Sequence, residues 1–520
     1  MKLLQLFLSL SFLTACAHQP STVDSQNEPK PLIAKPVVSV LDTWQVSQPS
    51  THENSHDDIL QRIIAAYGLN HELSNSRIQS QLNWYKKHQG YMDRIASRGE
   101  RYMYYIAEQI DVRGIPGELA LLPIVESAFD PFAYSHGRAS GVWQFIPSTG
   151  RDFGLTQDWW YDGRRDIQAS TQAALSYLEA LQREFKGDWL LALAAYNTGA
   201  GNVRKAIRKN KRKGLPTDFW SLQLPRETRD YVPKLIALAQ LIKNPEKYGI
   251  TLPSMSNEPY FATVNTGGQI DLSQLAEISE TDLEEIYKLN PGFNRWATHP
   301  NSKHQVLIPI EKVEAFTKNL AALPQNQRMK WHRYKVKSGD SLNTIAKKYH
   351  TTPEALRDAN GLKRNLIRTG DQLLIPSAYK PQKSYSHSAN SRLAKRQSSR
   401  RGKTTGKLEY RVRSGDSFWE IARDHKVGIK ELAKWNGMAP GDTLKQGQKL
   451  VIWKQKKSSR EQREVIRKLT YTVRNGDSMA RIAGKFRVRV QDIQRWNRQM
   501  AKNKYLQPGQ RLTLYVDVTN

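Results

Sequence analysis

The chain has 520 residues, too many for one hydrophobic core, so two to four domains are expected. Hydrophobic residues make up 39% and charged residues 25%, a balance that excludes a wholly disordered chain and fits globular domains joined by polar linkers. The net charge of +30 lies almost entirely in residues 331–520, where 43 Lys and Arg stand against 15 Asp and Glu, and it indicates an anionic partner such as a nucleic acid, a membrane or an acidic polymer.

Residues 1–16 have the pattern of an export signal. Lys2 is followed by an apolar run, Leu3 to Leu13, that is too short to cross a bilayer. The run ends in Leu-Thr-Ala-Cys16, which resembles the bacterial lipobox and implies a lipid attached to Cys16. Ala17 resembles the signal for sorting to the outer membrane, facing the periplasm. The alternative is an ordinary cleaved signal with an incidental cysteine. Cys16 is the only cysteine, so no intramolecular disulfide can form.

The next long segment predicts a mostly helical domain over residues 57–252. Its apolar residues recur at helical spacing, so that Met103, Ile106, Ala107 and Ile110 share one face. Period-two alternation is scarce here, which disfavours strands. Further helical runs lie at 166–185, 189–196 and 231–242.

Three segments of the basic half repeat one pattern. Each begins with Tyr-x-Val-x, continues with a Gly-Asp turn and a Ser that can cap a helix, and ends in an apolar strand. Two short amphipathic helices lie between, which predicts a β-α-α-β unit. The units are residues 333–377, 409–453 and 470–516.

Residues 258–320 keep part of this spacing. Asn290-Pro-Gly and Leu307-Ile-Pro stand where the repeats have their counterparts, but the Gly-Asp turn is missing. The segment is therefore either a degenerate fourth repeat or a spacer packed on the helical domain.

Polar composition marks the expected linkers. Residues 17–56 are rich in Ser, Pro, Gln and Asn and are expected to form a disordered tether. Residues 378–408 form a basic linker rich in Ser, Lys and Arg, and residues 454–469 form another.

Glu126 is the leading candidate for a catalytic group. It follows the apolar run at 119–125, and a carboxyl group in an apolar wall has a raised pKa and holds a proton near neutral pH. A general acid for glycosidic cleavage needs that property. A lone Glu on a helix is more often a solvated surface group. Asp130, Asp152, Asp158 and Asp162 lie nearby, and none has a comparable apolar setting.

The order of motifs strengthens that hypothesis. Glu126-Ser127 is followed by Ser135, Gly141-Val-Trp-Gln144-Phe145, Tyr196-Asn197 and Glu227-Thr-Arg-Asp-Tyr231. Over residues 100–240 this pattern resembles the lytic transglycosylases of lysozyme-like fold, glycoside hydrolase family 23. The three repeats resemble LysM modules, which bind glycans that contain N-acetylglucosamine. The expected fold class is α+β: a mostly helical lysozyme-like catalytic domain followed by small β-α-α-β LysM modules on flexible linkers.

The resemblance implies a reaction and a role for each residue. Glu126 would protonate the β-1,4 bond between N-acetylmuramic acid and N-acetylglucosamine of peptidoglycan, then accept a proton as the 1,6-anhydro sugar forms. Ser135, Gln144, Tyr196 and Asn197 would hold the sugar, with Tyr196 placed to hydrogen-bond the carboxyl group. Glu227 and Tyr231 would close the far wall of the cleft. Glu227 has an alternative role as a charge at a helix N-terminus.

Several tryptophans are ambiguous in sequence. Trp143 stands where the family commonly has an aliphatic residue or Met, and it either stacks on a sugar or fills the core. Trp159, Trp160 and Trp189 either line subsites or pack internally.

Other functions have weaker support. The 12 His show no His-Glu-x-x-His spacing and have no cysteine partner, so neither a metal nor any other cofactor is expected. The export signal argues against nucleic acid as the partner of the basic half. The expected partners are peptidoglycan glycan strands and, through the N-terminal lipid, a membrane. The alternative function is a catalytically silent peptidoglycan-binding lipoprotein.

Overall fold

The computed structural model describes residues 56–71, 75–349, 351–362, 364–399, 405–455, 466–486, 488–499 and 506–517. The predicted export signal, Cys16 and residues 17–55 of the predicted tether lie outside the described residues. Two compact units make up the chain, residues 1–391 and 392–520.

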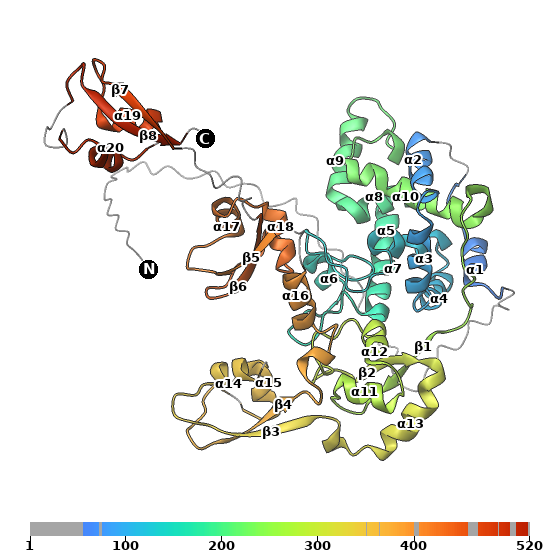
Figure 1. Cartoon of the computed structure of the whole chain (residues 1–520). Helices are drawn as coiled ribbons and strands as arrows, with labels where there is room; N and C mark the ends of the chain where they lie inside the picture. The colour runs from blue at the N-terminus through green and yellow to red at the C-terminus, as the bar shows by residue number, and fades with distance from the viewer. Residues whose placement is uncertain are drawn as a thin grey trace, which may run out of the picture. The chain divides into compact units, whose positions relative to one another are not determined.

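The first unit begins with a helical domain (Figure 1). Between residues 56 and 260 the described chain forms helices and isolated bridges but no strand, as the hydrophobic spacing predicted. The α-helices are α1 Ile59–Ala65, α2 Ser76–Tyr85, α3 Gln89–Gly99, α4 Met103–Arg113, α5 Leu122–Ser127, α6 Pro147–Asp152, α7 Ile167–Glu184, α8 Trp189–Thr198, α9 Ala200–Lys211 and α10 Arg226–Lys243, and the 3₁₀ turns are η1 Gly117–Leu121, η2 Phe219–Ser221 and η3 Glu246–Tyr248.

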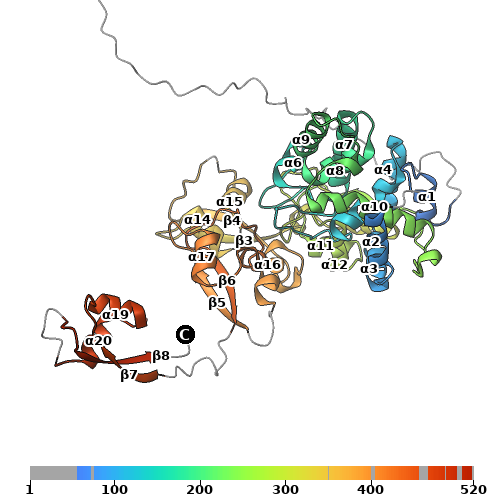
Figure 2. The ribbon, with the colours of Figure 1, turned by 90° about the horizontal axis from the view of Figure 1, so that it is seen from above.

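Helix α10 is the central element of this domain. It lies between α2 and α8 in Figures 1 and 2, and its residues Leu235 to Ala239 are all buried. The predicted apolar face of α4 is buried as well, and Ile106 is fully enclosed. Asp166 and Asp188 are the N-cap residues of α7 and α8. Their carboxylates accept hydrogen bonds from the free N–H groups of the first turn. These helices form one core, and that core carries the site described below.

The segment after the helical domain is a β-α-α-β module, referred to below as the fourth module. Strands β1 Phe261–Asn265 and β2 Gln305–Pro309 pair antiparallel, with Phe261 opposite Pro309, and enclose α11 Leu272–Ile278 and α12 Leu283–Leu289. Helix α13 Val313–Ala322 follows after the 3₁₀ turn η4 Ile310–Lys312. The Asn290 side chain fastens β2 to α12, because it donates to Ile286 O and Leu307 O and accepts from Leu307 N.

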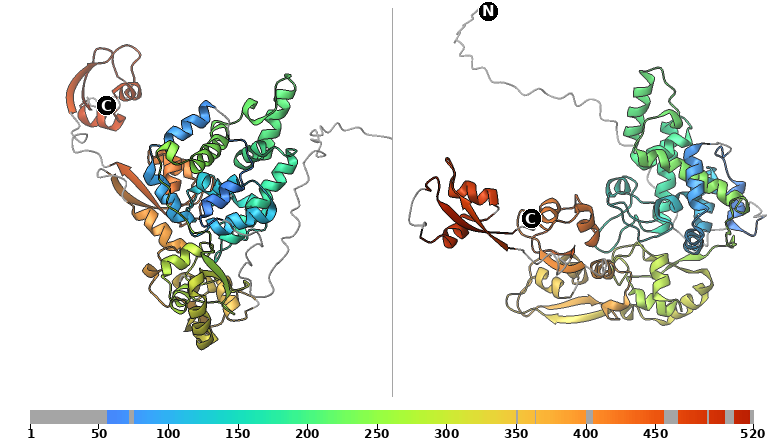
Figure 3. Two further views of the ribbon diagram at one scale, coloured as in Figure 1. Left: turned by 90° about the vertical axis from the view of Figure 1, so that its right-hand side faces the viewer. Right: turned by 45° about the horizontal axis from the view of Figure 1, so that its top comes forward.

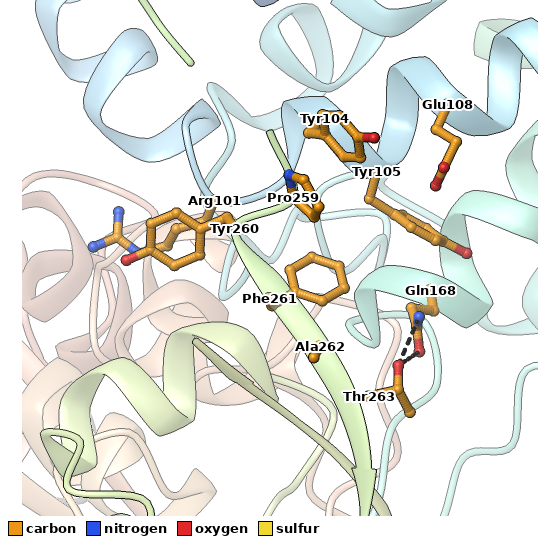
Figure 4. Close-up of a pocket in the computed structure, with 10 residues that line it drawn as sticks. All are labelled: Arg101, Tyr104, Tyr105, Glu108, Gln168, Pro259, Tyr260, Phe261, Ala262 and Thr263. Carbon is orange, nitrogen blue, oxygen red and sulfur yellow. Dashed lines mark hydrogen bonds between the residues drawn. The ribbon is translucent and has the colours of Figure 1, made fainter. Parts of the chain in front are cut away.

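The fourth module also packs on the helical domain (Figure 3). The Arg101 guanidinium lies 2.6 Å from the Glu285 carboxylate, and the Tyr102 hydroxyl donates to Lys288 O at 2.8 Å. Between α4 and β1 lies a cavity of about 30 Å³, lined by Tyr104, Tyr105 and Phe261 among others (Figure 4). That volume suits about one water molecule and is far too small for a sugar.

The three repeats have the predicted β-α-α-β order, each with its own small core. In each, a Tyr hydroxyl donates at 2.8 Å to the Asp of the Gly-Asp turn. In each, an Asn, at 360, 436 or 497, joins the second helix to the closing strand as Asn290 does. The elements are β3 Lys330–Lys335, α14 Leu342–Lys348, α15 Pro353–Ala359 and β4 Gln372–Ser377; β5 Thr405–Arg411, α17 Phe418–Asp424, α18 Ile429–Trp435 and β6 Lys449–Gln455; and β7 Ile466–Thr472, α19 Met479–Phe486, α20 Val490–Trp496 and β8 Arg511–Asp517.

Residues 378–399 of the predicted basic linker are folded. Tyr385 is fully buried, and its hydroxyl donates to the Asp271 carboxylate at the start of α11. Tyr379 N donates to the same carboxylate at 2.9 Å. The 3₁₀ turn η6 Gln382–Ser384 and helix α16 Ala389–Ser398 lie within the segment. Its first part is therefore a covering strap on the fourth module, a role that its polar composition did not indicate.

Candidate active site

Glu126 lies at the C-terminal end of the short helix α5. Leu122 and Ile124 of this helix are buried, whereas the Glu126 residue is partly exposed at the edge of the core. The helix ends because Ala128 and Phe129 both adopt left-handed backbone conformations, with φ of 51° and 54°. Two consecutive left-handed residues other than glycine carry backbone strain, and the full burial of the Phe129 side chain helps to hold them there.

The surroundings of Glu126 hold its proton near neutral pH. Burial raises the pKa of the carboxyl group from 4.5 to about 7. The Tyr231 hydroxyl donates a hydrogen bond to Oε1 and opposes that rise, while the negative charge of Glu227 adds to it and Lys234 reduces it. The predicted raised pKa is thus found in the structure, and it suits a group that gives and then takes a proton.

Three of the four other carboxylates considered from sequence have structural partners. Asp130 accepts from Phe132 N in a turn at 2.9 Å, and Asp158 accepts from Trp160 N at 2.7 Å. Asp162 is buried, but Arg164 and Arg165 keep its pKa below the usual value. These contacts give the three carboxylates structural roles in this part of the chain.

The predicted hydrogen bond between Tyr196 and the Glu126 carboxyl group was wrong. Its hydroxyl donates to Trp143 O at 2.8 Å, and the tyrosine that bonds the carboxyl group is Tyr231. Helix α10 packs directly against α5, which brings Tyr231 onto the carboxyl group. Burial raises the pKa of both tyrosines well above the usual value, so both hydroxyls are donors at neutral pH. Tyr196 still lies close enough for the Glu126 charge to contribute to its pKa.

The loop at 133–145 borders Glu126 and carries two of the predicted sugar ligands. Ser135 Oγ accepts from Ala139 N at 3.0 Å and so shapes the loop. Gln144 has φ of 50°, and its side chain donates to Gly141 O at 2.7 Å. Ser127 Oγ, beside Glu126, donates to Val142 O at 3.0 Å and ties the loop to α5.

The remaining candidates lie on α8 and α10. Asn197 Oδ1 accepts from Thr228 Oγ1 at 2.8 Å, which joins the end of α8 to the first turn of α10. Glu227 is exposed in that first turn, where its charge also suits the helix N-terminus. Its negative charge also contributes to the raised pKa of Glu126.

The tryptophans mostly pack internally. Trp143 is fully buried, and its Nε1 donates to Thr171 Oγ1 at 2.9 Å, which excludes sugar stacking. Trp160 is buried against Trp296 of the fourth module, and the Trp159 ring lies 4.0 Å from the Arg295 guanidinium. Trp189 packs partly buried against the helical core.

Among the residues that the structure describes, no three His, Cys, Asp or Glu side chains gather as a metal ion would need. Over the same residues, no helix has both the length and the apolar character of a membrane span.

The fold and site define a helical transglycosylase domain followed by LysM modules. A family model described as the transglycosylase SLT domain matches residues 104–218, and one described as the LysM-like domain of lytic transglycosylase MltD matches residues 260–325. The LysM domain model matches residues 334–376, 410–453 and 471–514.

Curated relatives and one solved structure show similarity to parts of this chain. Membrane-bound lytic murein transglycosylase D of Escherichia coli K12 is 38% identical over 384 residues, which cover 71% of this chain and 81% of that protein. An autolysin of Enterococcus faecalis is 30% identical over 32% of this chain and 22% of its own. Among solved structures, an inactive variant of lytic transglycosylase Slt from Pseudomonas aeruginosa is 24% identical over 28% of this chain and 24% of its own, with a TM-score of 0.23. The chain belongs to the family of membrane-bound lytic murein transglycosylase D.

The Tyr231 hydroxyl can be tested by its effect on pH dependence. Its hydrogen bond favours the charged carboxylate, so Tyr231→Phe raises the pKa of Glu126, by about one unit if the bond contributes roughly 1.5 kcal/mol. A rate that needs the protonated acid then persists to higher pH, and the alkaline limb of the kcat/KM profile moves upward. The control is Tyr196→Phe, which removes a hydroxyl that bonds a backbone carbonyl and leaves the limb in place. An unmoved limb in Tyr231→Phe contradicts the assignment.

The raised pKa of Glu126 also predicts that its carboxyl group lowers the free energy of unfolding when it is ionised. Below pH 4.5 the group is protonated in both the folded and unfolded states and costs nothing. The cost grows between pH 4.5 and about 7 and is complete above that, because the folded state then holds a charge that it disfavours. Glu126→Gln should therefore raise the melting temperature at pH 8 but not at pH 4. Glu246→Gln, an exposed carboxylate of the same domain, is the control and should change neither.

Proposed function

We propose that Glu126 is both the acid and the base of this peptidoglycan lytic transglycosylase. One observation carries the assignment: Glu126 lies at the edge of the core, and its carboxyl group has a pKa raised by burial to about 7 and accepts a hydrogen bond from Tyr231. A conventional glycosidase needs a second carboxylate as nucleophile or base. Asp130, Asp158 and Asp162 are held in other contacts, which favours a reaction that uses one carboxyl group twice.

The reaction then needs no water. Protonated Glu126 gives its proton to the oxygen of the β-1,4 bond between N-acetylmuramic acid and N-acetylglucosamine, and the bond from that oxygen to C1 breaks. The Glu126 carboxylate then removes the proton from the C6 hydroxyl of the muramic acid. O6 bonds to C1 and forms the 1,6-anhydro ring, while Glu126 regains its proton. The Tyr231 hydroxyl stabilises the carboxylate that exists between the two proton transfers.

The remaining site residues support this group or hold the sugar. Tyr196 donates to a loop carbonyl, which leaves its hydroxyl oxygen at the edge of the site as an acceptor for the glycan. Ser135 and Gln144 stand on the loop that borders the carboxyl group, and Asn197 and Glu227 stand where α8 and α10 meet. We assign these residues to substrate binding, with Glu227 facing a polar part of the sugar.

The LysM modules hold the enzyme on its substrate. Each of the three repeats folds around its own core, and their match to the LysM family supports binding of the N-acetylglucosamine units of the same glycan strands. Several weak sites on one chain raise the local concentration of the catalytic domain at the wall.

Product analysis tests this function. Purified sacculi digested by the protein should yield 1,6-anhydromuramic ends, which mass spectrometry distinguishes because they are lighter by one water than reducing ends. Glu126→Gln keeps the shape but removes the proton, and we expect a loss of activity of roughly 10³-fold. Reducing ends in place of anhydro ends would show a hydrolase, and undiminished digestion by Glu126→Gln would exclude Glu126 as the acid.

We assign Cys16 as a lipid attachment site that anchors the protein to the outer membrane, facing the periplasm. The Leu-Thr-Ala-Cys16 pattern and the membrane-bound Escherichia coli relative support this assignment. Cys16→Ala should release the protein from the membrane fraction and prevent incorporation of labelled palmitate. Unchanged fractionation and no label in the wild-type protein would favour an ordinary cleaved signal.

A further inference from the structure

The fourth module interlocks with the loop at 158–165 of the helical domain. Asp162 N donates to Gly292 O at 2.9 Å, and Asn294 N donates to Trp160 O at 2.7 Å, so the two backbones pair like short antiparallel strands. Gly292 has no room for a side chain, because a Cβ there would lie 2.6 Å from the Tyr161 ring. The Tyr161 ring cannot easily move away, since its hydroxyl donates to Asp166 at 2.7 Å.

A buried charge cluster continues from this contact. Asp162, Arg164 and Arg165 are each no more than 7% exposed, and the single carboxylate bonds both guanidinium groups. Buried cations are costly unless their remaining donors are satisfied. Arg165 donates to Pro291 O and to Asn294 Oδ1 of the fourth module, at 2.8 and 2.6 Å.

Arg164 points the other way, to the loop beside Glu126. Its Nη1 donates to Arg138 O at 2.7 Å and to Phe145 O at 3.2 Å, which fixes both ends of the segment that carries Gln144. Gly141 lies so close to the Arg164 backbone that a Cβ would stand 2.0 Å from the Arg164 carbonyl oxygen. The loop at 133–145 is therefore held by the charge cluster on one side and by Ser127 and Tyr196 on the other.

We propose that the fourth module supports the active site. It holds the loop at 133–145 in place through its contacts with the loop at 158–165. Arg164, Arg165 and Asn294 are positioning residues for the reaction, and the module's role is separate from glycan binding by the three repeats. The strap reinforces it, because Ala389 N donates to Asn294 O at 2.8 Å. This inference rests on the proposed function only in naming the loop as part of the catalytic site.

The test changes the module alone, in the full chain. Gly292→Ala introduces the clash with Tyr161, and Asn294→Ala removes the acceptor for Arg165 without a clash. Asn294→Asp keeps that acceptor but loses the amide that donates to Asp158 O at 3.1 Å, so it should rescue part of the loss. The control is Gly90→Ala, the same change on an exposed turn of α3 where the nearest atom is 3.7 Å away. Hydrogen exchange followed by mass spectrometry reports on the two loops, and kcat, KM and melting temperature are measured with soluble glycan strands.

We expect faster exchange at 158–165 and at 133–145 in Gly292→Ala and Asn294→Ala. We also expect kcat to fall about tenfold, since a small displacement of a positioning group costs at least that much. Unchanged exchange at 133–145 in both variants overturns the proposal, as does a kcat equal to that of Gly90→Ala. The exchange measurement does not depend on activity, so an error in the proposed function leaves this test intact.

Discussion

The hydrogen bond from Tyr231 to Glu126 is the contact on which the site depends. Burial alone would raise the pKa of the carboxyl group further and leave an acid too weak to give up its proton readily. A hydrogen bond to the carboxyl group without burial, in an open and hydrated site, would leave that group ionised at neutral pH, with no proton to give. The structure sets these two effects against each other on one group, and the resulting pKa of about 7 lies where acid and base roles are both accessible.

That balance needs two helices that are far apart in sequence to keep a fixed separation. Helix α5 is too short to be stable by itself. Its position is fixed by the burial of Leu122 and Ile124 and by the left-handed turn at Ala128 and Phe129. Helix α10 supplies the partner face, on which Tyr231 is only 5% exposed. The strain of the turn is therefore tolerated because a rigid core surrounds it.

The sequence predicted the features that depend on local residue patterns. It did not predict which way particular side chains point in the folded chain. The spacing of apolar residues was enough for the helices and for the β-α-α-β units, and the apolar run before Glu126 was enough for its raised pKa. Chain order did not reveal which of two tyrosines reaches the carboxyl group, because Tyr196 and Tyr231 both follow it at long range. Asp162 and Arg164 have charged side chains that normally lie in solvent, so their residue types alone predicted exposure and not burial. The Asp-Gly-Arg-Arg run at 162–165, beside two tryptophans, was the available signal.

The fourth module shows how one small fold can serve two purposes. In the first two repeats the helix after the first strand begins at Ser341 and Ser417, which form exposed capping boxes. The fourth module has Asp271 at that place, and this carboxylate is fully buried under Tyr379 and Tyr385. A buried carboxylate is tolerated only with such donors, so the Asp and its covering strap depend on each other. In the fourth module this end is therefore closed by the chain itself, whereas the Ser341 and Ser417 capping contacts of those two repeats are exposed.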